Sequence, residues 1–122
     1  MWDVQEANRA FYAAHEAGDV RAMFELWEHS ARVVCVHPGW PILRGWQAVG
    51  ASWQRILTGP VQTHFIITNE SVVLESDTAW VTCDENLMSL EHAGTVAAIN
   101  VFSRTEGGWR MVAHHGSHVL QM

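Results

Sequence analysis

Basic residues are scarce in this chain: 122 residues contain 7 Lys and Arg against 13 Asp and Glu, giving a formal net charge of −6. A protein that binds the backbone of a nucleic acid needs a basic surface, and so does one that binds an anionic membrane. The shortage of positive charge therefore argues against both. We expect neither a nucleic acid nor a membrane among the partners of this protein.

Cysteine and long apolar runs are also scarce. The two cysteines, Cys35 and Cys83, form no CxxC motif and lie in apolar, strand-like segments, which is typical of reduced core thiols in a cytosolic protein. No segment approaches the roughly 20 apolar residues that span a bilayer. Charges throughout residues 1–18 argue against a secretory signal peptide. We expect a soluble, cytoplasmic domain.

Local motifs for a metal or a phosphate are missing. The sequence has neither an HExxH pattern nor a glycine-rich phosphate loop. Its eight histidines invite a metal interpretation, and a set of His37, Glu85 and His115 is one conceivable ligand group. His114 and His115 are adjacent, so on a strand they face opposite sides and cannot share an ion. We therefore expect no metal and no cofactor.

Apolar residues make up 48% of the chain, and its length suits a single domain over residues 1–122 with one core. Apolar residues at helical spacing predict helices over residues 3–17, 20–27 and 46–57. Asp3 is a suitable N-cap for the first helix, with Glu6 completing a capping box. Gly18 ends this helix, and Asp19 caps the next one.

The remaining segments are strand-like. Residues 31–37 are rich in β-branched side chains, and Pro38 stops them. Further strands are predicted over residues 62–74, 78–90, 95–104 and 109–120, with a break near Asn69 and short turns that include residues 92–94. Short turns indicate antiparallel hairpins. The order of elements predicts an α+β fold, in which helices lie on one face of a curved antiparallel sheet.

Glu85 is the most unusual polar residue of these strands, because it belongs to an alternating row that is otherwise apolar. Burying an unpaired carboxylate costs several kcal/mol, so we expect Glu85 to have a partner or a raised pKa. His37, the last residue of the first strand, and His115 are the two expected partners. Alternation along the last strand places His115 and Ser117 on the face of Met111.

Several short motifs, taken in order, resemble the nuclear transport factor 2-like superfamily in its SnoaL-like branch, whose fold the ketosteroid isomerases share. They are EAGD (16–19), LW (26–27), HPGWPILRG (37–45), SW (52–53), VTCDEN (81–86), INVFSRTEGGWRM (99–111) and HHGS (114–117). The resemblance implies a cone, in which a strongly bent antiparallel sheet wraps around N-terminal helices and leaves a pocket at the wide end. Many members are homodimers through the outer sheet face. We therefore expect Trp80, Thr82, Asn86 and Met88, on that face, to form a dimer interface.

The resemblance carries the isomerase site over only in part. The tyrosine donor of the first helix falls near Phe11, which has no hydroxyl group, and Tyr12 is expected to point elsewhere. The general base falls between Cys35 and His37, and His37 is the better equivalent. The second donor falls on Asn100, whose amide can still donate. Because stabilisation of the oxyanion is usually the largest catalytic contribution, we do not expect steroid isomerisation.

Two kinds of function follow from these residues. One is an apolar pocket for a small hydrophobic molecule, with acid–base chemistry such as isomerisation, cyclisation, dehydration or hydrolysis. The other is a non-catalytic module for ligand binding or dimerisation, in which Glu85 braces the core and His37 holds its turn. The candidate catalytic residues are His37, Glu85 and His115. The candidate ligand-binding residues are Phe11, Trp27, Cys35, Trp40, Trp53, Asn100, Phe102 and Ser117.

Overall fold

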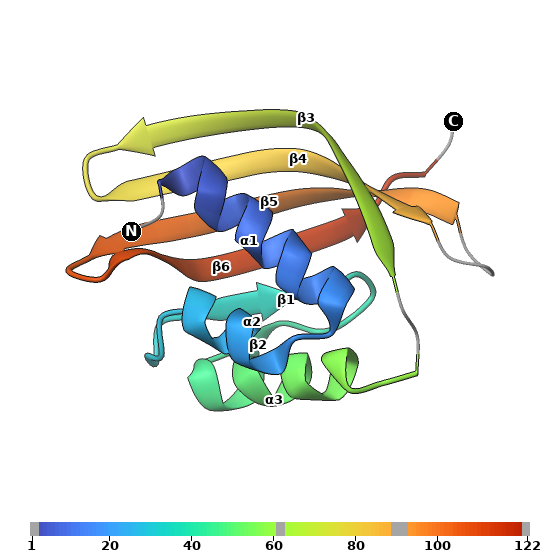
Figure 1. The fold of residues 1–122 in the computed structure, drawn as a ribbon, viewed down its shortest axis with the longest axis horizontal. Helices are drawn as coiled ribbons and strands as arrows, with labels where there is room; N and C mark the ends of the chain where they lie inside the picture. The colour runs from blue at the N-terminus through green and yellow to red at the C-terminus, as the bar shows by residue number, and fades with distance from the viewer. Residues whose placement is uncertain (1–2, 61–62, 89–92, 121–122) are drawn as a thin grey trace.

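The computed structural model describes residues 3–60, 63–88 and 93–120. Apart from one short additional strand before the third helix, the described elements follow the order that the sequence predicts (Figure 1). They are α1 (Val4–Ala17), α2 (Val20–Leu26), β1 (Val34–Val36), β2 (Leu43–Arg44), α3 (Trp46–Leu57), β3 (His64–Glu75), β4 (Thr78–Met88), β5 (Ala93–Thr105) and β6 (Gly108–His118). The expected strand ends at Gln62 and at residues 89–90, and the turn residue His92, lie outside the described residues.

The predicted N-caps of the first two helices, and Gly18 as the end of the first, are confirmed. The Asp3 carboxylate accepts a hydrogen bond from the Glu6 backbone N–H at 2.8 Å, and Asp19 does the same for Ala22 at 3.0 Å. Each of these bonds satisfies a donor that the first turn of a helix leaves free. Gly18 ends α1 in the left-handed region, with φ of 63°, where glycine carries no steric penalty.

The sheet has six strands in the order β2-β1-β6-β5-β4-β3, and it is mixed rather than wholly antiparallel. β1 pairs in parallel with β6, while the other pairs are antiparallel. The prediction of a purely antiparallel sheet is wrong at this pair, because α3 and four strands separate β1 from β6 and form a long crossover. β2 has two residues, too few to show an alternating pattern.

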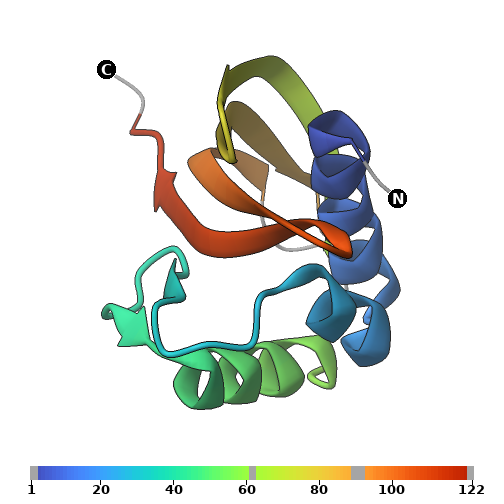
Figure 2. The ribbon, with the colours of Figure 1, turned by 90° about the vertical axis from the view of Figure 1, so that its left-hand side faces the viewer.

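The sheet curves, and its concave side holds the core (Figures 1 and 2). α1 lies across this side, and α3 lies beneath α2, β1 and β2. The largest fully buried side chains come from both layers and include Phe11, Trp27, Trp53 and Phe102. None of the described helices is long and apolar enough to cross a membrane.

Two β-bulges interrupt the hairpins. In β3 the register shifts between Thr68 and Ser71, and Asn69 takes a left-handed backbone with φ of 55°, which agrees with the predicted break. In β6 the register shifts opposite Val101 and Phe102, which leaves Val112 without a partner. An extra residue in one strand reverses the alternation of side chains beyond it. The second bulge therefore decides which histidines of β6 face the core.

Candidate functional site

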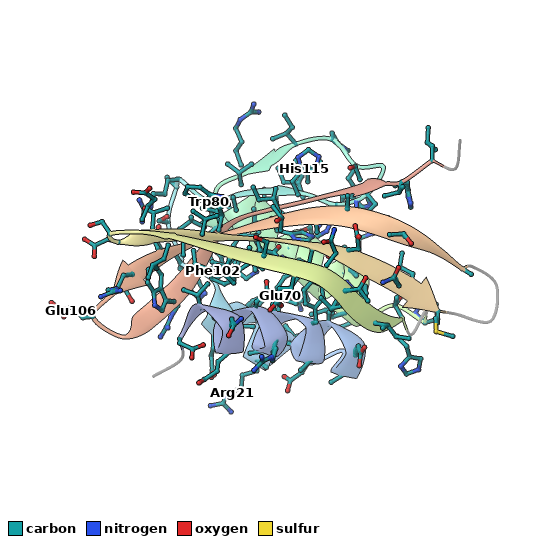
Figure 3. All side chains as sticks on the ribbon, turned by 90° about the horizontal axis from the view of Figure 1, so that it is seen from above. Arg21, Glu70, Trp80, Phe102, Glu106 and His115 are labelled. Atoms are coloured by element: carbon teal, nitrogen blue, oxygen red, sulfur yellow. The ribbon has the colours of Figure 1, made fainter. Side chains whose placement is uncertain are left out.

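The bulge at Val112 places His114 inside and His115 outside. His114 is buried, whereas His115 and Ser117 are exposed and line a depression on the outer face of the sheet. Figure 3 shows His115 and Trp80 on the side of the sheet away from α1, and Phe102 on the side of α1. The prediction that His115 and Ser117 share a face with Met111 is therefore wrong. Strict alternation fails because Val112 is an extra residue.

Glu85 is buried, as its position in the row predicts, but its partner is Tyr12. The Tyr12 hydroxyl donates to Glu85 Oε2 at 2.5 Å, and the Cys83 sulfur lies 3.4 Å from the same hydroxyl. Among the residues that the structure describes, the Glu85 carboxyl group has no other hydrogen-bond partner. The predictions that Glu85 pairs with His37 or His115, and that Tyr12 points elsewhere than into the site, are wrong.

The buried face of α1 is wider than its apolar stripe. Asn8 and Tyr12 are both buried, next to Ala7 and Phe11. Residues four apart lie above one another on a helix, so Asn8 and Tyr12 form a polar column beside the apolar one. A polar pair at this spacing is the signal that could have located them in the sequence. Counting apolar residues alone cannot, because such a count omits Asn8 and does not register the Tyr12 hydroxyl.

Asn100 is the junction of the buried network. Its Nδ2 donates to Asn8 Oδ1 at 2.8 Å and to the Tyr12 hydroxyl at 3.1 Å, and its Oδ1 accepts from His114 Nδ1 at 2.6 Å. Asn8 Nδ2 in turn donates to Glu70 Oε2 at 3.1 Å. Both N–H groups of the Asn100 amide are thus engaged. The expected role of Asn100 as a donor to a ligand would require one of these bonds to break.

Burial controls the electrostatics of this network. It raises the pKa of Glu85 to about 7, although the hydrogen bond from Tyr12 acts in the opposite direction. It lowers the pKa of His114 to about 3, assisted by the neighbouring His37. Burial, followed by the nearby Glu85, also raises the pKa of Tyr12. At neutral pH the network therefore contains a neutral imidazole, a neutral phenol and a carboxyl group that exists in both protonation states.

His37 belongs to a separate group of residues. It is buried at the end of β1, and its Nε2 lies 2.9 Å from Ser52 Oγ. The Ser52 hydroxyl donates its proton to the carbonyl of Val49 at 2.7 Å, so His37 Nε2 must be the donor to Ser52. Burial lowers the pKa of His37 to about 4, with the nearby His15 acting in the same direction. His37 therefore fastens β1 to α3, and it does not activate Ser52 as a nucleophile.

Most of the predicted ligand-binding residues pack against one another. The Trp53 indole is in edge-on contact with Phe11 at 5.4 Å and with His37 at 4.7 Å between ring centroids. Trp40 is half-buried against His37 at 5.0 Å. Six of the eight predicted ligand-binding residues are at most 2% exposed, namely Phe11, Trp27, Cys35, Trp53, Asn100 and Phe102. The Trp27 and Trp53 indole N–H groups are buried without a hydrogen-bond partner among the described residues.

A depression between α1 and β3 reaches the network from outside. It has a volume of about 220 Å³, and its lining residues include Asn8, Tyr12, Glu16, Ile67 and Glu70. Tyr12 lies at its inner wall, with Glu85 directly bonded to the Tyr12 hydroxyl. Within residues 3–60, 63–88 and 93–120, no group of three His, Cys, Asp or Glu side chains is arranged to hold a metal ion.

This fold and this pattern of motifs match a known family: the SnoaL-like domain covers residues 4–121. The chain belongs to this family. The resemblance to the nuclear transport factor 2-like superfamily is therefore confirmed. A candidate dehydratase of the NTF2-like family from Streptomyces avermitilis is 40% identical, with a TM-score of 0.90 over 97% of this chain and 94% of that one.

Two further relatives carry different names. A candidate calcium/calmodulin-dependent protein kinase type II association domain from Thiobacillus denitrificans is 32% identical, with a TM-score of 0.87 over 96% of this chain and 95% of that one. The F-box protein SKIP8 from Arabidopsis thaliana is 30% identical over 113 residues, which are 93% of this chain and 48% of that protein. This SnoaL-like chain thus spans about half the length of its curated relative. Because one fold hosts several functions, the function must be argued from the site.

Proposed function

We propose that the protein carries out general acid–base chemistry, of the dehydratase or isomerase type, on a small and mainly apolar molecule. The observation that carries this proposal is the bond between Tyr12 and Glu85, because it holds a buried carboxyl group whose pKa is raised to about 7. A group with a pKa near the working pH can both remove and return a proton. The name of the Streptomyces avermitilis relative, a candidate dehydratase, agrees with this type of reaction.

The depression between α1 and β3 supports the choice of substrate. At about 220 Å³ it is smaller than the roughly 300 Å³ at which pockets for drug-sized ligands begin, so the ligand is compact. Tyr12 separates this depression from Glu85, and the Tyr12 ring packs against Phe65 at 5.5 Å between centroids. A ligand that reaches Glu85 displaces the Tyr12 hydroxyl and lies against the Tyr12 and Phe65 rings. Its reacting end is polar, and its apolar part contacts these two rings.

Replacing Glu85 with Gln removes the proton-carrying group and keeps its size. We expect Glu85→Gln to lower proton exchange between solvent and an acidic carbon of small hydroxy or keto compounds at least 100-fold, because acid–base catalysis contributes about that much. The measurement follows deuterium incorporation by NMR in heavy water. Glu75→Gln, at an exposed position at the end of β3, serves as the matched control and should retain full exchange.

The pH profile separates this role from a structural one. If Glu85 is the acid–base group, the rate of exchange follows a single ionisation near pH 7. Glu85→Gln should abolish this dependence while the protein stays folded, as judged by near-ultraviolet circular dichroism. A profile without this ionisation, or unchanged exchange in Glu85→Gln, contradicts the proposed function.

Self-association through the outer sheet face is a second candidate, and a specific observation favours it. Large apolar side chains on that face are exposed: Ile66 by 54%, Met88 by 56%, and Val73 and Ile99 by 38% each. Val34, Ala113, Val101, Trp80 and Val73 continue the apolar surface in one row across five strands. Exposed apolar patches of this kind mark association surfaces. The name of the Thiobacillus denitrificans relative, a candidate association domain, agrees with this candidate.

A charge at the centre of this face should prevent association. Ile99 lies between Thr82 and His115 on the outer face, so a carboxylate at this position would be buried in a dimer interface. We expect Ile99→Glu to be monomeric in sedimentation equilibrium, with an affinity loss of at least 100-fold, because an unpaired buried charge costs about 3 kcal/mol or more. Ile42→Glu, equally apolar and 52% exposed in the loop before β2, should associate like the unmodified protein. A monomeric unmodified protein would refute this second candidate.

A further inference from the structure

Each hydrogen bond of the buried network has a defined donor and acceptor, and these can be assigned one after another from the exposed end of the network. Glu70 lies on the β3 bulge, which turns it toward α1, where its Oε2 accepts from Asn8 Nδ2 (Figure 3). A carboxylate can only accept hydrogen bonds. Asn8 must therefore present its NH₂ group to Glu70 and its carbonyl oxygen to Asn100.

The orientation of Asn8 then determines which atoms of the other side chains donate and which accept. Because Asn8 Oδ1 is an acceptor, Asn100 must face it with Nδ2, which also donates to the Tyr12 hydroxyl. Asn100 Oδ1 is left for His114, so His114 Nδ1 carries the proton. Tyr12 already accepts from Asn100, and its own proton goes to Glu85. The tautomer of His114 and the orientation of the Tyr12 hydroxyl thus follow from one end of the chain.

The same side chains could satisfy their hydrogen bonds in the opposite direction. If both amides turned over, Asn8 Nδ2 and the Tyr12 hydroxyl would donate to Asn100 Oδ1, and Asn100 Nδ2 would donate to His114 Nδ1. His114 would then carry its proton on Nε2, and Tyr12 would no longer donate to Glu85. When Glu85 is protonated, its carboxyl group is compatible with either arrangement, because it can donate to Tyr12 or accept from it. Under those conditions only the acceptor at Glu70 distinguishes the two.

We propose that Glu70 is a positioning residue, which fixes the direction of the Asn8–Asn100 hydrogen-bond chain and thereby aims the Tyr12 hydroxyl at Glu85. Glu70 is exposed and does not touch Glu85, so it acts entirely through these side chains. The effect of Glu70 on catalysis rests on the proposed function. Its effect on the tautomer of His114 does not, because that effect follows from hydrogen bonding alone.

The tautomer can be observed by NMR in protein labelled with ¹⁵N-histidine, since protonated and unprotonated ring nitrogens have different shifts. At about pH 6, below the raised pKa of Glu85, the unmodified protein should show His114 with its proton on Nδ1. Glu70→Lys replaces the acceptor with a donor and should shift His114 to the form protonated on Nε2. Glu70→Gln, which can donate or accept, should populate both forms. Glu75→Lys makes the same charge change at an exposed position of the same strand and should leave the Nδ1 form intact.

The tautomer of His114 in the two Glu70 variants and in the Glu75→Lys control tests the positioning role of Glu70. A His114 that keeps its proton on Nδ1 in both Glu70 variants overturns the proposal, whatever the activity. A shift to Nε2 in Glu70→Lys but not in Glu75→Lys supports it. If that shift occurs but Glu85→Gln leaves proton exchange unchanged, the positioning of the network stands and the proposed catalytic function fails.

Discussion

Asn100→Leu should destabilise the protein by roughly 3–5 kcal/mol, because each unsatisfied buried polar group costs about 1–3 kcal/mol. Leucine has a similar volume but neither donates nor accepts. It would leave Asn8 Oδ1 and His114 Nδ1 without their partners and remove the donor that orients Tyr12. All of these groups are buried, so water cannot replace the lost bonds. Urea unfolding followed by circular dichroism measures the free energy of unfolding.

Asn86 provides the matched control. Its side chain also makes three hydrogen bonds, to the Ile66 carbonyl, Thr68 and Thr95, but it is half-buried on the outer sheet face. Water can reach these partners, so Asn86→Leu should cost about 1 kcal/mol or less. Equal losses for the two variants would show that burial does not decide the strength of the Asn100 junction.

The second large effect is a loss of stability in acid. Burial lowers the pKa of His37 to about 4 and that of His114 to about 3, and it also lowers the pKa of His15. Because the unfolded chain binds these protons first, the histidines stabilise the fold fully above their ordinary pKa of about 6.5. This contribution is lost as the pH falls from about 6.5 toward the folded-state values.

Glu85 acts in the opposite direction. Its folded-state pKa of about 7 lies above its ordinary value of 4.5, so its contribution is complete at low pH and is lost as the pH rises through about 7. The pH dependence that Glu85 gives to the free energy of unfolding cancels that of one histidine. The histidines outnumber it, and we therefore expect the free energy of unfolding to fall by roughly 1–2 kcal/mol per pH unit between about pH 6 and about pH 4.5.

His37→Gln tests the origin of this slope. Glutamine can still donate to Ser52 but binds no proton in this range, so the slope should decrease by about 1 kcal/mol per pH unit. His115→Gln, which replaces an exposed imidazole on the outer face of the same sheet, serves as the control. The measurement is a series of urea titrations over this pH range. The interpretation fails if the two variants have the same slope.

Much of the fold could be predicted from the sequence because its local signals agree. Asp3 and Gly18 mark the ends of α1, and the hairpin turns mark the long strands. The burial of Glu85 followed from the apolar residues around it in one alternating row. Such signals depend on residues that are close in the sequence, where the geometry of a helix or strand is fixed. The parallel pairing of β1 with β6 escaped prediction because it joins distant segments.

The residues of the candidate site also divide into those that local sequence patterns predict and those that depend on contacts between distant segments. The apolar row around Glu85 is enough to predict that Glu85 is buried and needs a partner, and the β-branched segment before Pro38 places His37 at the end of the first strand. The packing of segments that are distant in the sequence makes Tyr12 the partner and places His114 rather than His115 inside. The bulge at Val112 is one extra residue of β6 in its pairing with β5. That register is a property of two strands together, and the partner of a buried carboxyl group depends on which helix packs over it. Neither is encoded in the spacing of residues along one segment.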